Sequence, residues 1–319
     1  MSAPQTPLVV MNPAGDIARQ QADLITTSTL LMLLIIVPVI VLTLLFAWRY
    51  RAANKSATYE PDCDHSTKLE LLIWGAPLLI IVALGALTWI STHKLDPYRM
   101  LTRIDAERPL PAGTQPMVVQ VVALDWKWLF IYPEQGIATV NELAAPVDRP
   151  IRFELTSSTV MNSFFVPALA GQIYAMPGMR SQLHAVINRA GDYEGFSANY
   201  SGNGFSGMRF TFKGLTEAGF AQWVQQARAS GATLDRAAYL KLEQPSERAP
   251  VQRFAEVTPK LFDAAVERCV DTQKMCMGQM MAIDAAGGLG KGGIAGLASQ
   301  PWRGSERRVV AGLCTPRDL

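Results

Sequence analysis

Few residues in the central part of this 319-residue chain could hold a metal ion or carry out acid–base chemistry. The chain has four cysteines and three histidines. No cysteine lies between Cys63 and Cys269, and the only histidine in the last two thirds of the sequence is His184. Copper centres are built from thiolate, imidazole and thioether groups. Of these groups, the loop from Asn199 to Met208 offers only the thioether at its end.

A cluster of sulfur-containing side chains lies nearer the C-terminus, at Met275, Cys276, Met277, Met280 and Met281. These side chains could bind or handle copper. Methionine is also an adaptable apolar residue, so the alternative is a segment that contacts a partner or moves. For Cys269 and Cys276 we expect no disulfide, because seven residues on one continuous helix separate the Cα atoms by about 10 Å.

Two apolar stretches in the first third of the chain must position whatever chemistry the protein performs. Leu24–Trp48 and Leu71–Thr92 carry no formal charge and are rich in leucine, isoleucine and valine. A bilayer core needs roughly 20 apolar residues of helix, so both stretches are long enough to cross a membrane. The sequence therefore predicts a transmembrane helical hairpin over residues 24–92.

The distribution of basic residues predicts how this hairpin is oriented. The loop that joins the two stretches carries Arg49, Arg51, Lys55 and Lys68. The tail of residues 1–23 carries one basic residue, Arg19. Basic residues favour cytoplasmic loops, so we expect this tail and everything after the second helix on the outer face. We expect neither a signal peptide nor a lipidated cysteine within this chain, and leave open whether either lies upstream.

After residue 110 the pattern changes to short runs of β-forming residues separated by prolines and glycines. Several strands at this spacing favour a β-sandwich, and about 100 residues suit one Greek-key sandwich. We therefore predict a sandwich domain over residues 110–214. The predicted strands are Met117–Ala123, Lys127–Tyr132, Ile151–Thr156, Ser163–Val166, Gln182–Ile187 and Arg209–Phe212.

Beyond residue 214 the pattern becomes helical. One face of an amphipathic helix carries Phe220, Trp223, Val224 and Ala227. Thr233 could cap a second helix, and Thr258 would open a third that runs to about Val270. The prediction is a helical extension over residues 215–270 and a flexible, glycine-rich tail over residues 271–319.

A two-helix membrane hairpin followed by an outer sandwich resembles subunit II of the haem–copper terminal oxidases. The resemblance implies an α+β membrane protein with a cupredoxin-like domain. In the cytochrome c oxidase branch, this domain holds a dinuclear copper centre through the motif C-x-E-x-C-x-x-x-H-x-x-M and one earlier histidine. The matching positions of this chain are Asn162, Ser197, Asn199, Ser201, Phe205 and Met208. Only Met208 agrees with the motif, so the resemblance implies a sandwich that has lost its copper.

Longer strings narrow the resemblance to subunit II of the cytochrome bo-type ubiquinol oxidases. These strings are Asp125–Trp128, Ile131–Glu142, Val160–Phe165, Gln172–Met176 and Phe205–Met208. Cytochrome c is a water-soluble donor that needs a copper port on the outer face. A quinol is dissolved in the membrane and can deliver electrons directly to a haem in the catalytic subunit. The lost ligands therefore favour a quinol as the electron donor.

The resemblance implies a non-catalytic subunit of a proton-translocating complex that oxidises ubiquinol and reduces dioxygen to water. It implies no cofactor in this chain, with haems and copper in the partner subunit I, through which quinol acts. Further partners would be smaller membrane subunits and the lipid of a bacterial inner membrane, with the sandwich on the periplasmic face. A net charge of +2 gives no electrostatic case for nucleic acid.

Three further residues are interpreted through the resemblance. Glu70 precedes the second apolar stretch, where the family places a glutamate at the mouth of a proton channel into subunit I. The alternative is a solvated carboxylate favoured by the helix dipole. Trp126 and Trp128 lie beside the former copper loop, and we expect them to pack against subunit I. The alternative for both tryptophans is a vestigial docking patch.

Two other functions remain as alternatives. A copper-bearing cytochrome c oxidase subunit II would need the missing cysteine and histidine ligands. A membrane-anchored β-sandwich could instead bind a ligand or partner outside any oxidase. Copper analysis tests the first alternative, and the presence or absence of a haem-bearing partner on purification tests the second.

Overall fold

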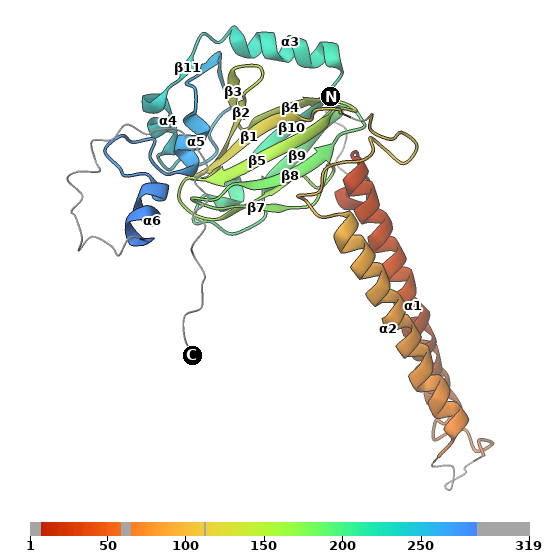
Figure 1. Cartoon of the computed structure of the whole chain (residues 1–319). Coiled ribbons are helices and arrows are strands. Elements are labelled where there is room, and N and C mark those ends of the chain that lie inside the picture. Colours follow the sequence, from red (N-terminus) through yellow and green to blue (C-terminus); the bar gives the residue numbers. More distant parts are fainter. Residues whose placement is uncertain (1–7, 59–64, 112, 286–319) are drawn as a thin grey trace.

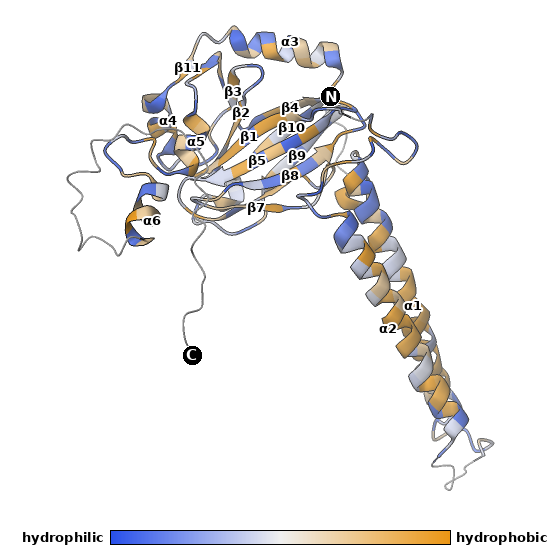
Figure 2. Cartoon of the chain, in the orientation of Figure 1, coloured by the Kyte–Doolittle hydropathy of each residue, from blue (hydrophilic) through white to orange (hydrophobic). Residues whose placement is uncertain are grey.

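Two long helices form a hairpin that projects from the rest of the molecule (Figure 1). The structure, a computed structural model, describes residues 8–58, 65–111 and 113–285. α1 spans Asp16–Arg49 and α2 spans Thr67–Lys94, so each helix contains one of the predicted apolar stretches. Figure 2 shows apolar residues along most of the hairpin, and their side chains are largely exposed. Both helices are long and apolar enough to cross a membrane.

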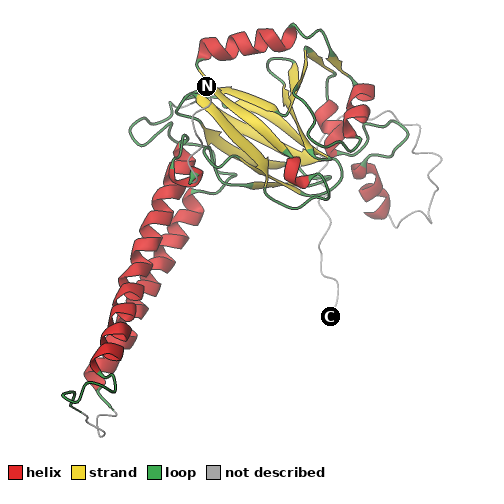
Figure 3. Cartoon of the chain, turned by 180° about the vertical axis from the view of Figure 1, so that it is seen from behind, coloured by secondary structure: helices red, strands yellow, loops and turns green. Residues whose placement is uncertain are grey.

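Two β-sheets pack face to face at one end of the hairpin (Figures 1 and 3). The strands are β1 (Met117–Leu124), β2 (Lys127–Tyr132), β3 (Ile137–Val140), β4 (Glu142–Pro146), β5 (Pro150–Ser157), β6 (Asn162–Phe165), β7 (Ile173–Ala175), β8 (Ser181–Val186), β9 (Gly191–Ser197), β10 (Arg209–Leu215) and β12 (Gln252–Phe254). One sheet has the order β12-β3-β2-β1-β5-β8 and the other β4-β10-β9-β6-β7. The pairs β1–β5 and β4–β10 are parallel. This arrangement confirms the predicted sandwich.

All six predicted strands are present, as β1, β2, β5, β6, β8 and β10. Five further strands of the two sheets, β3, β4, β7, β9 and β12, were not predicted. β9 contains two glycines and two acidic residues, and β4 ends in Ala-Ala-Pro, so their intrinsic β-propensity is weak. β9 is held instead by its antiparallel pairing with β10, and β4 by its parallel pairing with β10.

An aromatic cluster joins the two sheets. Trp128 and Phe130 of β2 meet Phe164 of β6 and Phe210 of β10. The rings of Phe164 and Phe210 stack with centroids 5.4 Å apart, and Trp128 meets Phe164 edge-on at 5.4 Å. Fully burying one such side chain contributes about 2 kcal/mol, so this cluster is a main source of the sandwich's stability.

The C-terminal extension covers one edge of the sandwich. α3 (Glu217–Arg228) buries the predicted face of four side chains, and the Thr216 hydroxyl caps it by accepting from the Gly219 N–H. α4 spans Arg236–Glu243 and is capped by Asp235, not by Thr233. Thr233 lies instead in β11 (Thr233–Leu234), which pairs with β13 (Glu256–Val257).

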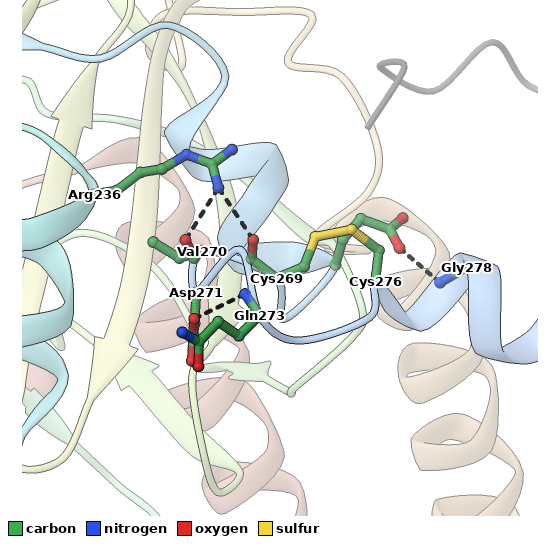
Figure 4. The surroundings of a disulfide bond; sticks show 8 residues. Arg236, Cys269, Val270, Asp271, Gln273, Cys276 and Gly278 are labelled. Atoms are coloured by element: carbon green, nitrogen blue, oxygen red, sulfur yellow. Dashed lines mark hydrogen bonds between the residues drawn. A yellow bond between two sulfur atoms is a disulfide. The ribbon is translucent and has the colours of Figure 1, made fainter. Parts of the chain in front are cut away.

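The third helix of the extension is shorter than predicted, and this changes the cysteine pairing. α5 covers only Leu261–Val266, because Lys260 and Arg268 adopt left-handed backbone conformations at φ 62° and 56°. The chain therefore turns back after α5 and brings the Cα atoms of Cys269 and Cys276 to 4.8 Å. The two cysteines form a disulfide (Figure 4), so the expectation of unpaired thiols on one helix was wrong.

The segment predicted as a flexible tail begins with ordered contacts. Just before this segment, the Arg236 guanidinium donates to the carbonyls of Cys269 and Val270 (Figure 4). Within it, the Asp271 carboxylate accepts from the Gln273 N–H at 3.0 Å. α6 (Met277–Ala285) follows the disulfide, and its first N–H donates to the Glu267 carbonyl at 2.8 Å. Residues 286–319 of the predicted tail lie outside the described residues.

Candidate functional site: the former copper-ligand loop

Pairing of two strands brings together Asn162 and Ser197, two of the positions that the resemblance aligns with copper ligands. β6 begins at Asn162 and β9 ends at Ser197, and the two strands are antiparallel neighbours. The Ser197 hydroxyl lies 3.1 Å from the Asn162 amide oxygen and 3.2 Å from the Asn199 carbonyl. Asn162 and Ser197 are both buried. Where a copper centre would need thiolate and imidazole, the chain has a hydroxyl–amide hydrogen bond.

The middle of the loop is held by polar contacts and one ring contact. The Asn199 amide nitrogen donates to the carbonyls of Met161 and Tyr200. The Ser201 carbonyl accepts a hydrogen bond of 3.0 Å from the Trp126 indole N–H. The ring of Phe205 meets the ring of Tyr200 edge-on, with centroids 5.8 Å apart. Ser201 and Phe205 thus serve the packing of the loop itself.

Met208 lies in the core of the sandwich. Its side chain is 1% exposed, and its carbonyl accepts from the Ser197 N–H at 3.2 Å. The main chain therefore keeps the two ends of the former ligand loop adjacent, although the side chains have changed. A buried thioether also fills apolar space well, which explains Met208 without any metal.

The donor set of this loop does not fit a dinuclear copper centre. Two bridging thiolates have no equivalent in the hydroxyls of Ser197 and Ser201, and an amide and a phenyl ring cannot replace two imidazoles. Among the residues that the structure describes, no group of three or more His, Cys, Asp or Glu side chains is arranged to hold a metal ion. Cys276 of the sulfur-rich cluster is bonded to Cys269, and the Met277 sulfur packs against Gly178.

The two tryptophans beside the loop have different environments. Trp126 is half-buried at the β1–β2 turn with a left-handed backbone at φ 63°. Its indole packs so closely on Gly204 that a Cβ there would lie 2.4 Å from the ring. Trp128 is fully buried in the core of its own domain. The expectation that Trp128 faces subunit I was wrong, because strand alternation points its side chain between the sheets; for Trp126 that contact remains a prediction.

A buried carboxylate missed by the sequence analysis fastens the extension to the sandwich. Glu142 of β4 accepts from the Trp223 indole at 2.8 Å and the Arg253 guanidinium at 2.7 Å, and it pairs with Lys213 at 2.9 Å. Burial raises the pKa of Glu142, but the hydrogen bonds from Lys213, Arg253 and Trp223 hold it below its usual range. The partners lie up to 111 residues away, so no sequence spacing could reveal them.

The start of α1 is locked into the sandwich. The N–H groups of Ala14 and Gly15 donate to the Ala168 carbonyl at 2.8 and 3.0 Å. A Cβ on Gly15 would lie 2.5 Å from the Val186 carbonyl oxygen, so only glycine fits. The buried carboxylate of Asp16 receives two hydrogen bonds from Arg103, at 2.9 and 3.0 Å. These contacts fasten the start of the hairpin to the outer domain.

His184 of β8 lies beside the C-terminal end of α2, and Glu70 lies at the N-terminal end of the same helix. The His184 ring nitrogen Nδ1 and its main-chain N–H both lie within 3.2 Å of the Pro97 carbonyl. Burial lowers the pKa of His184, with further lowering from Arg152, so the ring is neutral near pH 7. Glu70 lies in the first turn of α2, and its half-exposed carboxylate is 2.8 Å from the exposed His65 ring.

The hairpin and sandwich define a membrane subunit with an outer domain of the oxidase subunit II type. Residues 134–214 match the family "Cytochrome C oxidase subunit II, periplasmic domain", and residues 228–273 match "COX Aromatic Rich Motif". The chain belongs to the subunit 2 family of the cytochrome bo-type ubiquinol oxidases. It is therefore a subunit of an oxidoreductase complex, which confirms the function expected from the sequence.

Three relatives carry this assignment. "Cytochrome bo(3) ubiquinol oxidase subunit 2" of Pseudomonas aeruginosa is 51% identical over 80% of this chain and 74% of its own length. "Ubiquinol oxidase subunit 2" of Acetobacter aceti is 51% identical over 82% of each chain. "Quinol oxidase subunit 2" of Bacillus cereus is 37% identical over 75% of this chain and 79% of its own.

Proposed function

We propose that this chain is the copper-free, non-catalytic outer-domain subunit of a proton-translocating complex that oxidises ubiquinol and reduces dioxygen to water. The observation that carries the proposal is the hydrogen-bonded pair of Asn162 and Ser197 at two former ligand positions. That pair, with Met208 buried in the core, leaves a packed scaffold in place of an electron port. The haems and copper of the complex would then all reside in subunit I.

Because the haems and copper would reside in subunit I, electrons would enter the complex there. A quinol diffuses within the bilayer and can reach subunit I directly, so no soluble donor has to dock on the outer domain. The outer domain instead covers and braces subunit I, with smaller membrane subunits and lipid completing the assembly. The locked joint at Gly15 and Asp16 supports this role, because it transmits the position of the membrane hairpin to the sandwich.

The placement in the membrane has the sandwich on the periplasmic face of a bacterial inner membrane, with residues 50–66 on the cytoplasmic side. The basic residues of that loop support this orientation. The exposed apolar surface of α1 and α2 supports contact with subunit I on one side and lipid on the other.

Glu70 is proposed to form part of a proton entrance on the cytoplasmic side. Its carboxylate is half-exposed at the start of α2, and the neighbouring His65 could relay protons to it. A Glu70→Gln variant should slow proton uptake by the complex at unchanged haem content. Lys68→Gln, two residues earlier on the same turn, is the matched control and should leave uptake unchanged. Equal uptake rates in all three proteins would contradict the role of Glu70.

Purification of the whole complex in detergent tests the proposal. Haem analysis, copper analysis and a ubiquinol oxidation assay should yield a haem-bearing partner, quinol oxidase activity and no copper bound by this chain. Stoichiometric copper in this subunit with a thiolate charge-transfer band would overturn the copper-free assignment. Purification without any haem-bearing partner would overturn the assignment to an oxidase complex.

A further inference from the structure

A cavity of about 300 Å³ with both polar and apolar walls lies where the hairpin meets the sandwich. Its walls come from the first turns of α1, from Lys94 at the end of α2, from the segment Leu95–Arg103 that follows, and from His184 of β8. A second hollow of about 380 Å³ continues between the ends of α1 and α2. Gln21, Leu95, Asp96 and Pro97 line both, so the cavity and the hollow form one continuous groove.

The part of the groove between the helices suits the glycerol and the first acyl carbons of a lipid. On α2 it is lined at helical spacing by Thr88, Ser91, Thr92 and Leu95, and Leu24 of α1 lies in the same lining. Trp89, next to this face, is 70% exposed. Exposed tryptophans near helix ends are typical of the membrane–water interface, so this hollow lies at the depth of glycerol and the first acyl carbons.

The part of the groove next to the sandwich is positively charged. Arg103 is neutralised by Asp16, which also accepts from Gln20. Among the described residues Lys94 forms no ion pair, and the guanidinium of Arg99 contacts only the His93 carbonyl, at 3.3 Å. Asp96 is the remaining acid, and one of its oxygens is occupied by the Tyr98 N–H. Two cations therefore face one carboxylate at the membrane surface.

We propose that this groove binds one anionic phospholipid, whose phosphate is held by Lys94 and Arg99 while an acyl chain enters between α1 and α2. Lysine and arginine are the usual partners of phosphate, because both carry positive charge and donate hydrogen bonds to its oxygens. The combined size suits a headgroup with its glycerol. The inference rests on the proposed membrane placement of the hairpin, but not on the proton entrance or on the copper-free loop.

Native mass spectrometry of the detergent-purified complex tests the site. Wild type and the control Lys68→Gln, which removes an exposed lysine at the other end of α2, should each retain one phospholipid that Lys94→Gln/Arg99→Gln loses. Haem content should be equal in all three. Equal lipid retention in the double variant would overturn the proposal, and it is also the result expected if subunit I fills the groove. Loss of haem from every protein would instead show that the oxidase complex does not assemble, which would contradict the proposed function and not the lipid site.

A second variant and two ligands complete the test. Ser91→Phe fills the hollow without touching a charge, and it should also lose the lipid. Delipidated wild type should regain one dioleoyl phosphatidylglycerol molecule, and millimolar inorganic phosphate should not displace it. Displacement by inorganic phosphate would overturn the lipid assignment in favour of a simple anion site. Retention of lipid by Ser91→Phe would overturn the path of the acyl chain.

Discussion

The Ser197 hydroxyl lies 3.1 Å from the Asn162 amide oxygen, although the two residues are 35 positions apart. The Ser197 N–H is also 3.2 Å from the Met208 carbonyl. The backbone thus still gathers three of the former ligand positions at one end of the sandwich. A copper site lost by side-chain replacement alone should be recoverable by side-chain replacement alone.

Restoring the ligand set should therefore create a coloured copper site. The variant carries Asn162→His, Ser197→Cys, Asn199→Glu, Ser201→Cys and Phe205→His, with Met208 as the thioether ligand already present. We expect an intense visible thiolate-to-copper band when copper is supplied, because thiolate and imidazole are the ligands that copper prefers. The control keeps Ser197 and Ser201 and should remain colourless. A folded, colourless full variant would mean that this loop is not aligned with the copper motif.

Glu142→Gln should destabilise the outer domain by about 2 kcal/mol. The change leaves Lys213 and Arg253 facing a neutral group, and the loss is moderated because their side chains are 29% and 30% exposed. Urea unfolding of the purified complex, followed by tryptophan fluorescence, measures the change. Glu134→Gln removes an exposed ion pair with Arg149 and should cost under about 0.5 kcal/mol. Equal effects of the two variants would contradict the role of Glu142.

The same carboxylate predicts a pH dependence. Its pKa is lower in the folded protein than in the unfolded chain, so its stabilisation is complete above the unfolded value, about 4.3. The stabilisation is lost as the pH falls through the folded value. The stability difference between wild type and Glu142→Gln should thus be constant near neutrality and shrink below about pH 4. A difference that grows in acid would contradict the lowered pKa.

The sequence predicts best what local pattern determines. The apolar lengths of the hairpin, the β-forming runs of β1 and β2 and the buried face of α3 all depend on neighbours a few residues apart, and each was confirmed. The Glu142–Arg253 pair depends on a distant partner and was missed. Trp128 was misassigned because β2 is buried on both faces and apolar at nearly every position, so its sequence does not show which side chains point between the sheets.

Tight packing at Gly15 predicts a sensitive joint between hairpin and sandwich. Gly15→Ala would place a Cβ 2.5 Å from the Val186 carbonyl oxygen and 2.7 Å from that of Leu169. Because neither carbonyl belongs to a flexible side chain, the joint must open, at a cost of about 2 kcal/mol. Thermal unfolding of the complex should shift downward. Gly75→Ala in α2 has no atom within 4 Å of the new Cβ and should shift little; a larger shift there than at Gly15 would contradict the argument.

Removal of the disulfide should destabilise the segment after α5 rather than the whole outer domain. Cys269 and Cys276 close a loop of sequence separation 7, for which chain entropy predicts a stabilisation of about 2 kcal/mol. Cys269→Ala/Cys276→Ala should therefore lower the stability of the segment after α5 by that amount and make this segment easier to cleave with protease. Wild type treated with reductant should show the same cleavage, which controls for the lost side chains.

Because Arg236 still binds the carbonyls of Cys269 and Val270, the core around Trp128 should stay protected. Cleavage that begins in the sandwich strands would show that the bond supports the entire domain instead.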